Sequence, residues 1–185
     1  MIKPIQTKYK NQIFRSRLEA RWAVFFDYMN VGYRYEGEGY EAGGIKYLPD
    51  FYIPDHKLYI EVKPLFPPKK ELKKVFMLRD NIGGDCYVGV LYGYPAIKTD
   101  NDGFIIGADY CLFLINPYGA EDDQECLFSQ CRRCGSFLFR ESIAALIPDH
   151  ELQGLMAYGC CDRCGMADTE ELKSAYNNAQ THRFY

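Results

Sequence analysis

The chain has 185 residues, of which 48% are hydrophobic and 25% are charged. This balance indicates one ordinary folded domain, or one domain with a small appendage, and excludes a disordered or fibrous protein. No apolar run approaches the ~18 residues that a membrane-spanning helix requires, so we expect no membrane association. The first residues are basic and contain no apolar core of a secretory signal, which favours a cytoplasmic location.

The charge is unevenly distributed along the chain. A net charge of −3 argues against a general nucleic-acid coat protein, for which a basic domain is expected. Residues 1–22, however, contain six Lys or Arg and one acid, and residues 57–79 contain seven and two. These segments form either a local basic surface or ordinary solvated faces.

The first half of the chain predicts a helix followed by three strands. The helix is expected from Phe14 to Asn30, with Ser16 as a cap near its start. Strands are expected from Tyr33, from Ile45 to Tyr52 after a Gly43-Gly44 turn, and from Leu58 to Lys63. In the last of these, alternation places Tyr59, Glu61 and Lys63 on one face. The pattern is an antiparallel meander behind a helix.

The second half predicts a helix, two strands and a C-terminal appendage. Pro67-Pro68 precedes the helix, whose lysine-rich face is opposite its apolar face. Strands are expected over Cys86–Tyr94 and Tyr110–Ile115. A polar stretch, Gly119–Glu125, then marks a boundary, and a short polar helix is expected over Thr169–Ala179.

Five of the eight cysteines cluster near the C-terminus. Two Cys-x-x-Cys pairs, each followed by Gly, predict a four-thiolate zinc ribbon, with Cys131, Cys134, Cys161 and Cys164 as ligands. Four thiolates leave no open position, so the zinc is expected to be structural. Cys160 competes with Cys161 as a ligand, and a pair of disulfides is the alternative to zinc. Cys86 and Cys111 lie in apolar strands and are interpreted as core residues.

Three acids and a lysine form a second candidate site, made of Glu19, Asp50, Glu61 and Lys63. Asp50 and Glu61 can face each other across a hairpin, and clustered carboxylates bind hard divalent cations such as Mg²⁺. A lysine beside such a metal can polarise a nucleophilic water or stabilise negative charge. In the alternative interpretation, Glu61 and Lys63 are an exposed pair, Asp50 caps a turn, and Glu19 pairs with Arg15 or Arg21.

Pro49-Asp50 followed by Glu61-Val62-Lys63 resembles the PD-(D/E)XK nuclease superfamily. The run from Tyr47 to Pro54 looks like a branch of it that is typical of phages or mobile elements and is often followed by a zinc ribbon. The resemblance covers about residues 13–94. It implies an α/β fold with an αβββαβ core and a mixed central sheet. It further implies residues 1–118 as the nuclease-like core and residues 119–185 as the zinc ribbon and C-terminal helix. A phage protein would act in the host cytoplasm.

The resemblance also implies roles for individual residues in a Mg²⁺- or Mn²⁺-dependent deoxyribonuclease. Asp50 and Glu61 would bind the metal, with the Val62 carbonyl as a third ligand. Glu19 would complete a second metal position or orient water, and Lys63 would be the catalytic lysine. Because relatives often cut as dimers, a homodimer is an expectation of the resemblance.

Basic side chains flank this site in the sequence and are candidate contacts to DNA phosphates: Arg15, Arg17, Lys69, Lys70, Lys73 and Lys74. Solvated helix faces are the alternative interpretation. A non-catalytic nucleic-acid-binding or adaptor protein, docking partners through its zinc ribbon, is the alternative function. A structural zinc protein has only the ribbon to support it.

Overall fold

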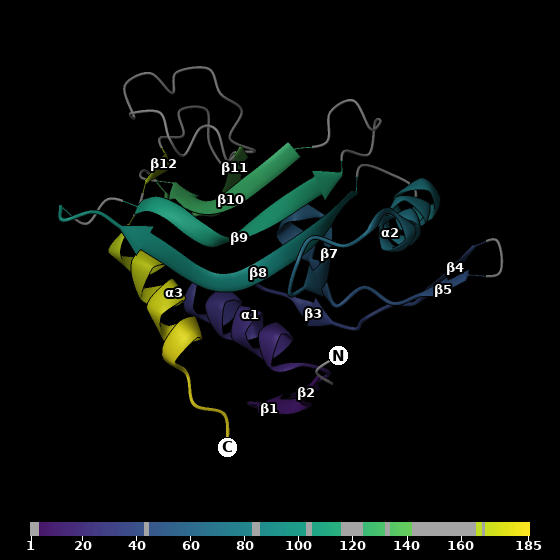
Figure 1. The fold of residues 1–185 in the computed structure, drawn as a ribbon, viewed down its shortest axis with the longest axis horizontal. Helices are drawn as coiled ribbons and strands as arrows, with labels where there is room; N and C mark the ends of the chain where they lie inside the picture. Colours follow the sequence, from purple (N-terminus) through teal and green to yellow (C-terminus); the bar gives the residue numbers. More distant parts are fainter. Residues whose placement is uncertain are drawn as a thin grey trace. The chain divides into compact units, whose positions relative to one another are not determined.

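The computed structural model describes residues 4–42, 45–82, 86–102, 105–115, 124–131, 134–141, 166–167 and 169–185. These residues form a mixed α/β fold with three α-helices: α1 (Arg17–Tyr28), α2 (Lys69–Ile82) and α3 (Glu170–Thr181) (Figure 1). None of the three is long and apolar enough to cross a membrane.

The chain forms two compact units, each built from separated segments. Unit 1 comprises residues 1–31, 94–111 and 125–185, and unit 2 comprises residues 32–93 and 112–124. Strands β8 (Tyr87–Thr99) and β9 (Ile105–Ile115) each contribute residues to both units. The predicted division into 1–118 and 119–185 stays a prediction.

Unit 2 contains a mixed sheet in the order β3-β6-β7-β8-β9. The short strands β3 (Arg34–Tyr35) and β6 (Phe51–Ile53) are antiparallel neighbours, and β6 is antiparallel to β7 (Leu58–Lys63), with Phe51 opposite Ile60. β7 is parallel to β8 along its whole length. A 3-10 turn, η1 (Pro54–His56), joins β6 to β7.

The predicted strand from Ile45 to Tyr52 is wrong in one respect, because it is broken in the middle. Its first part, β5 (Ile45–Tyr47), pairs with β4 (Tyr40–Ala42) in a separate two-stranded sheet that projects beyond the strands of unit 2 (Figure 1). Its second part is β6. Pro49 lies at the break, and a proline has no N–H to donate to a strand ladder. The predicted turn at Gly43-Gly44 lies outside the described residues.

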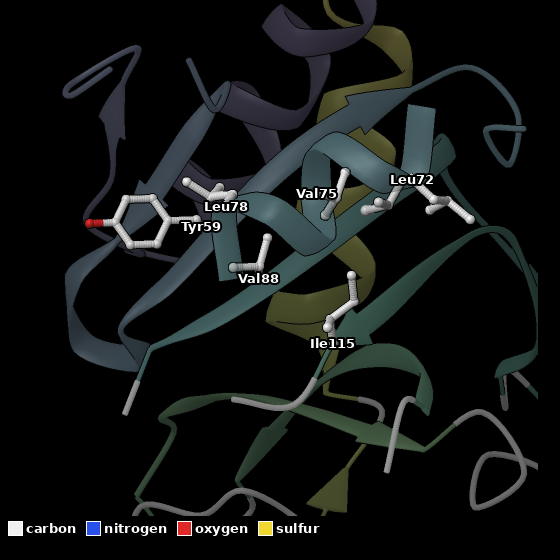
Figure 2. Close-up of a cluster of buried hydrophobic side chains, with 7 residues drawn as sticks. Tyr59, Leu72, Val75, Leu78, Val88 and Ile115 are labelled. Atoms are coloured by element: carbon white, nitrogen blue, oxygen red, sulfur yellow. The ribbon is translucent and has the colours of Figure 1, made fainter. Parts of the chain in front are cut away.

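Helix α2 covers one face of the unit 2 sheet. Its buried residues Leu72, Val75 and Leu78 pack against Tyr59 of β7 and Val88 of β8. Figure 2 shows this cluster, with Ile115 of β9 at its edge and the Tyr59 hydroxyl directed away from the other members. Every residue from Val88 to Leu91 is buried, which is typical of a central strand with a parallel neighbour.

Unit 1 is organised around α1 and α3, which pack against each other. The large apolar residues Trp22, Phe25 and Phe26 of α1 are buried, each with no exposed surface. The rings of Phe25 and Tyr176 of α3 are 4.6 Å apart between centroids. Unit 1 also contains the hairpin of β1 (Thr7–Tyr9) and β2 (Gln12–Phe14). The predicted helix is confirmed, but it begins at Arg17 and not at Phe14, because Phe14 ends β2. Its partner α3 is far along the chain, as the hydrogen bond between Arg21 and the Ala179 carbonyl shows.

Three further strands follow β9. β10 (Gln124–Cys131) is antiparallel both to β11 (Phe137–Glu141) and to the short β12 (Met166–Ala167). Strands β8 and β9 are longer than predicted, because residues 95–99 and 105–109 have a mixed composition without clear alternation. The last helix begins one residue after its predicted start, with Thr169 as its N-cap.

Leu78→Ala should destabilise the protein by about 2–5 kcal/mol, because Leu78 is 1% exposed and its truncation leaves a cavity under α2. Lys74→Ala, on the exposed face of the same helix, should change stability by less than about 0.5 kcal/mol. Urea unfolding followed by circular dichroism measures both. Equal losses in the two variants would contradict the packing described for α2.

Candidate active site

Asp50 is a buried carboxylate at the break between β5 and β6. Its side chain is 2% exposed, and Oδ2 accepts a hydrogen bond of 2.7 Å from the backbone N–H of Val62 in β7. The carbonyl of Asp50 accepts a second hydrogen bond from the N–H of Glu36. Asp50 therefore joins the start of β6 to the end of β7, and does not merely cap a local turn.

Glu61 and Lys63 are paired on the face of β7 that α2 covers. Lys63 Nζ donates to Glu61 Oε1 over 2.6 Å. The side chain of Glu61 is only 12% exposed and that of Lys63 is 30% exposed. The prediction that the two side chains lie on one face is confirmed, and the alternative of a solvent-exposed pair does not describe this geometry.

Two further residues belong to this group and were not identified from the sequence. Tyr47, the last residue of β5, donates its hydroxyl to Glu61 Oε2 over 2.8 Å. Glu71, in the first turn of α2, has Oε2 3.9 Å from Lys63 Nζ. The sequence offers one indication of the Glu71 position, because α2 begins only six residues after Lys63 and its first turn must therefore lie near the end of β7. Tyr47 has none, because its position depends on the separate β4–β5 hairpin.

The acids around Lys63 determine its charge. Burial acts to lower the pKa of Lys63, but the opposing charge and hydrogen bond of Glu61, with the charges of Asp50 and Glu71, raise the pKa above its usual value of 10.5. The resulting contribution to stability is fully present below the usual pKa and is lost as the pH rises through the raised one. Lys63 is therefore a fixed cation at neutral pH.

Glu19 belongs to unit 1, whereas Asp50, Glu61 and Lys63 belong to unit 2. Glu19 takes part in a cap at the start of α1 that is similar to a capping box: its N–H donates to Ser16 Oγ, and the Ser16 hydroxyl donates to Glu19 Oε1 over 2.6 Å. Glu19 Oε2 accepts a hydrogen bond from the backbone N–H of Arg15. At 7% exposure Glu19 is buried. Its catalytic role stays a prediction.

The unit 2 residues offer a limited ligand set for a divalent metal. No group of three or more His, Cys, Asp or Glu positioned to hold a metal ion occurs in the described part of the chain. Asp50 and Glu61 supply two carboxylates on adjacent strands, which suits a hard cation that keeps several waters. Because the Lys63 ammonium already occupies Glu61 Oε1, a metal bound at that oxygen would displace it. The raised pKa of Lys63 indicates that the surroundings favour positive charge.

The six predicted phosphate-binding residues are all exposed. Lys69, Lys70, Lys73 and Lys74 lie on the outer face of α2 in unit 2, and Arg15 and Arg17 lie at the start of α1 in unit 1. The four lysines of α2 have no acidic partner within the described ranges. They begin beside the candidate site, since Glu71 of the same helical turn reaches Lys63.

The first predicted zinc-binding pair lies at the tip of the β10–β11 hairpin. Gly135 has a φ of 73°, as expected for the glycine after the second cysteine, and its N–H donates to the Cys131 carbonyl. The N–H of Cys131 donates to the Ser136 carbonyl, which closes the turn. The other candidates, Cys160, Cys161 and Cys164, lie outside the described residues.

The other described cysteines are Cys86, Cys111 and Cys126. Cys111 and Cys126 are buried, and Cys86 is half-buried against the cluster under α2. The predicted core position is confirmed for Cys111 and holds in part for Cys86.

Comparisons of the chain with models of known protein families, with characterised proteins and with solved structures give no match.

Substitutions at the capping box separate the structural role of Glu19 from any chemical one. Ser16→Ala should destabilise the protein by about 1 kcal/mol, because the N–H of Glu19 loses its acceptor. Glu19→Gln should change stability less, since glutamine also serves at this position of a capping box. Thermal unfolding of both variants measures the difference, and a larger loss for Glu19→Gln would show that the charge itself stabilises unit 1.

Proposed function

We propose that this protein is a metal-dependent nuclease that hydrolyses DNA phosphodiester bonds, with a PD-(D/E)XK core. The observation that carries the proposal is the grouping of Asp50, Glu61 and Lys63 at one edge of β6 and β7. With the β4–β5 hairpin inserted between β3 and β6, the element order α1, β3, β6, β7, α2, β8 agrees with the αβββαβ order of that superfamily, and β7 and β8 are parallel. Both features support the assignment.

In the proposed site, Asp50 and Glu61 hold Mg²⁺ or Mn²⁺, with the Val62 carbonyl as a third protein ligand. Such an ion polarises a phosphoryl oxygen and lowers the pKa of a bound water. The Tyr47 hydroxyl holds Oε2 of Glu61 by a hydrogen bond. Oε1, which accepts from Lys63, is therefore the oxygen at which the metal would replace the Lys63 ammonium. The Val62 N–H of β7 holds the Asp50 carboxylate in place by a hydrogen bond to Oδ2.

Lys63 acts in this proposal as a cation and not as a base. A lysine with the usual pKa of 10.5 is already protonated at neutral pH, and the neighbouring carboxylates outweigh burial and raise the pKa of Lys63 further, so Lys63 does not act as a base. A fixed positive charge beside the scissile phosphate stabilises the negative charge that develops in the transition state. Arg15, Arg17 and the four lysines of α2 are the proposed contacts to DNA phosphates.

A structural zinc ion is the second metal of the proposal, bound by Cys131, Cys134, Cys161 and Cys164. It is supported by the turn at Gly135 and by the pairing of Cys131 with Met166 in β12, two residues after Cys164 in the sequence. In the described part of the chain, the β10–β11 hairpin, which carries Cys131 and Cys134, is thus paired with β12, the strand that follows Cys164 in the sequence.

One observation favours the alternative of a non-catalytic DNA-binding or adaptor protein. Both oxygens of Glu61 already have hydrogen-bond donors, Lys63 and Tyr47, so the Glu61 carboxylate is hydrogen-bonded without a metal. The two functions differ in a measurable way, because an adaptor binds DNA and never cuts it.

The test of the nuclease is cleavage of supercoiled, linear, single-stranded and branched DNA with Mg²⁺ or Mn²⁺. Asp50→Asn, Glu61→Gln and Lys63→Ala should each reduce the rate at least 100-fold, since each removes a charge on which the reaction depends. Asp80→Asn is the matched control, because Asp80 is an exposed acid of the same helix α2 that pairs with Arg79, and its rate should change less than about twofold.

Full activity in the Asp50 or Glu61 variant would contradict the assignment, and DNA binding without cleavage by the wild type would favour the adaptor. Glu19→Gln belongs in the same series. A large loss of rate in a stably folded Glu19→Gln variant would add Glu19 to the catalytic group, and a normal rate would restrict it to capping.

The purified protein should contain about one zinc per chain by elemental analysis. Cys131→Ser should lose the metal, whereas Cys126→Ser, at a buried core position, should retain it. Cys160→Ser should be tolerated and Cys161→Ser should not. Mild EDTA should stop cleavage before zinc is lost, and Mg²⁺ or Mn²⁺ alone should restore it, because thiolate-bound zinc exchanges slowly. Recovery with zinc only would overturn this division of roles.

A further inference from the structure

Three large apolar side chains are exposed beside the candidate site. Leu48 is 37% exposed, Leu65 78% and Phe66 45%. Leu48 lies two residues before Asp50, and Leu65 and Phe66 follow Lys63 by two and three residues. Because β6 and β7 are antiparallel, the start of β6 and the end of β7 lie at the same edge of the sheet. The exposed apolar side chains and the ionic group therefore share one edge of unit 2.

Phe66 is held in a fixed orientation although it is exposed. Its ring contacts Tyr92 of β8 and Phe113 of β9 edge-on, with centroid distances of 5.2 and 5.4 Å and interplanar angles of 74° and 85°. Such perpendicular contacts anchor an aromatic ring through its packing. The exposed part of the ring is thus preorganised and loses little conformational freedom when a planar group packs on it.

Cations follow this apolar edge immediately in the chain. α2 begins at Lys69, three residues after Phe66, and exposes Lys69, Lys70, Lys73 and Lys74. None of these four ammonium groups pairs with an acid in the described segments. An anchored exposed aromatic ring beside a row of unpaired cations fits a ligand with flat apolar rings on an anionic backbone. Single-stranded nucleic acid has this chemistry.

We propose that the edge formed by Leu48, Leu65 and Phe66 binds unpaired DNA bases, so that the substrate is single-stranded, or locally unpaired, at the position that is cut. Phe66 stacks on a base, Leu65 and Leu48 pack against neighbouring bases and sugars, and the α2 lysines contact phosphates. In regular duplex DNA the base faces are already stacked and are not available to Phe66. This inference rests on the proposed function, because it defines the substrate of the same site.

Binding is measured separately from cleavage, by fluorescence anisotropy of the full chain without added divalent metal. The probes are a 20-nucleotide single strand, the matching duplex and the duplex with a central gap. The single strand and the gapped duplex should bind at least tenfold more tightly than the intact duplex. Phe66→Ala should weaken single-strand binding about tenfold, within the range for one base–aromatic stack, and duplex binding less than twofold.

Two controls guard against loss of folding. Leu65→Ser should weaken single-strand binding without affecting stability, because Leu65 is largely exposed. Tyr28→Ala removes an exposed aromatic ring from the end of α1, at 49% exposure, and should leave binding unchanged. A 2-aminopurine in the single strand should be quenched by the wild type and not by Phe66→Ala.

The outcomes separate the inference from the nuclease. Equal affinity for duplex and single strand, or no effect of Phe66→Ala and Leu65→Ser, would overturn the inference, while Asp50-dependent cleavage would still support the nuclease. Phe66-dependent binding of single strands without cleavage of any DNA would keep the base-binding edge and overturn the nuclease. A dimer that Leu65→Ser dissociates, with no change in DNA binding, would make the edge a self-association surface and overturn the inference.

Discussion

The hydrogen bond from the Val62 N–H to the Asp50 carboxylate is the interaction on which the candidate site depends. The register that places Phe51 opposite Ile60 would bring Pro49 opposite Val62, at a point where the strand ladder has already ended. A buried N–H without an acceptor costs about 1–3 kcal/mol, and the Asp50 side chain supplies the acceptor. The break in the strand leaves the Val62 N–H without a strand partner, and the buried Asp50 carboxylate takes the place of that partner.

The fixed Asp50 carboxylate determines which charges can lie beside it. Asp50 and Glu61 on adjacent strands would repel each other if nothing opposed them, and Lys63 supplies the opposing charge. Tyr47 and Glu71 bring the β4–β5 hairpin and α2 into the same group. A site of this kind is stable as it stands and is also able to exchange one cation for another, which is the physical basis for proposing a metal there.

Local patterns predicted the elements that carry the site, but not the way the site is completed. Strict alternation made β7 predictable to its end residues, and a serine before an amphipathic run made the N-cap of α1 predictable. The break at Pro49 was missed because the residues on both sides of it have strand composition. Tyr47 was missed because a tyrosine at the end of a short hairpin has no local pattern that indicates a carboxylate partner 14 residues away. Such pairings arise from tertiary structure, and no local periodicity encodes them.

The pairing of α1 with α3 has a consequence for how the protein is made. The contacts between these helices join the first and last parts of the chain, as the Arg21–Ala179 hydrogen bond illustrates. During synthesis, which proceeds from the N-terminus, α1 emerges long before α3 exists. Its aromatic face, with Phe25 still lacking its contact to Tyr176, stays exposed or is covered temporarily until α3 has been synthesised. The α1–α3 packing of unit 1 therefore forms only after α3 has left the ribosome, and ribosome-bound chains that lack α3 present an apolar surface to chaperones.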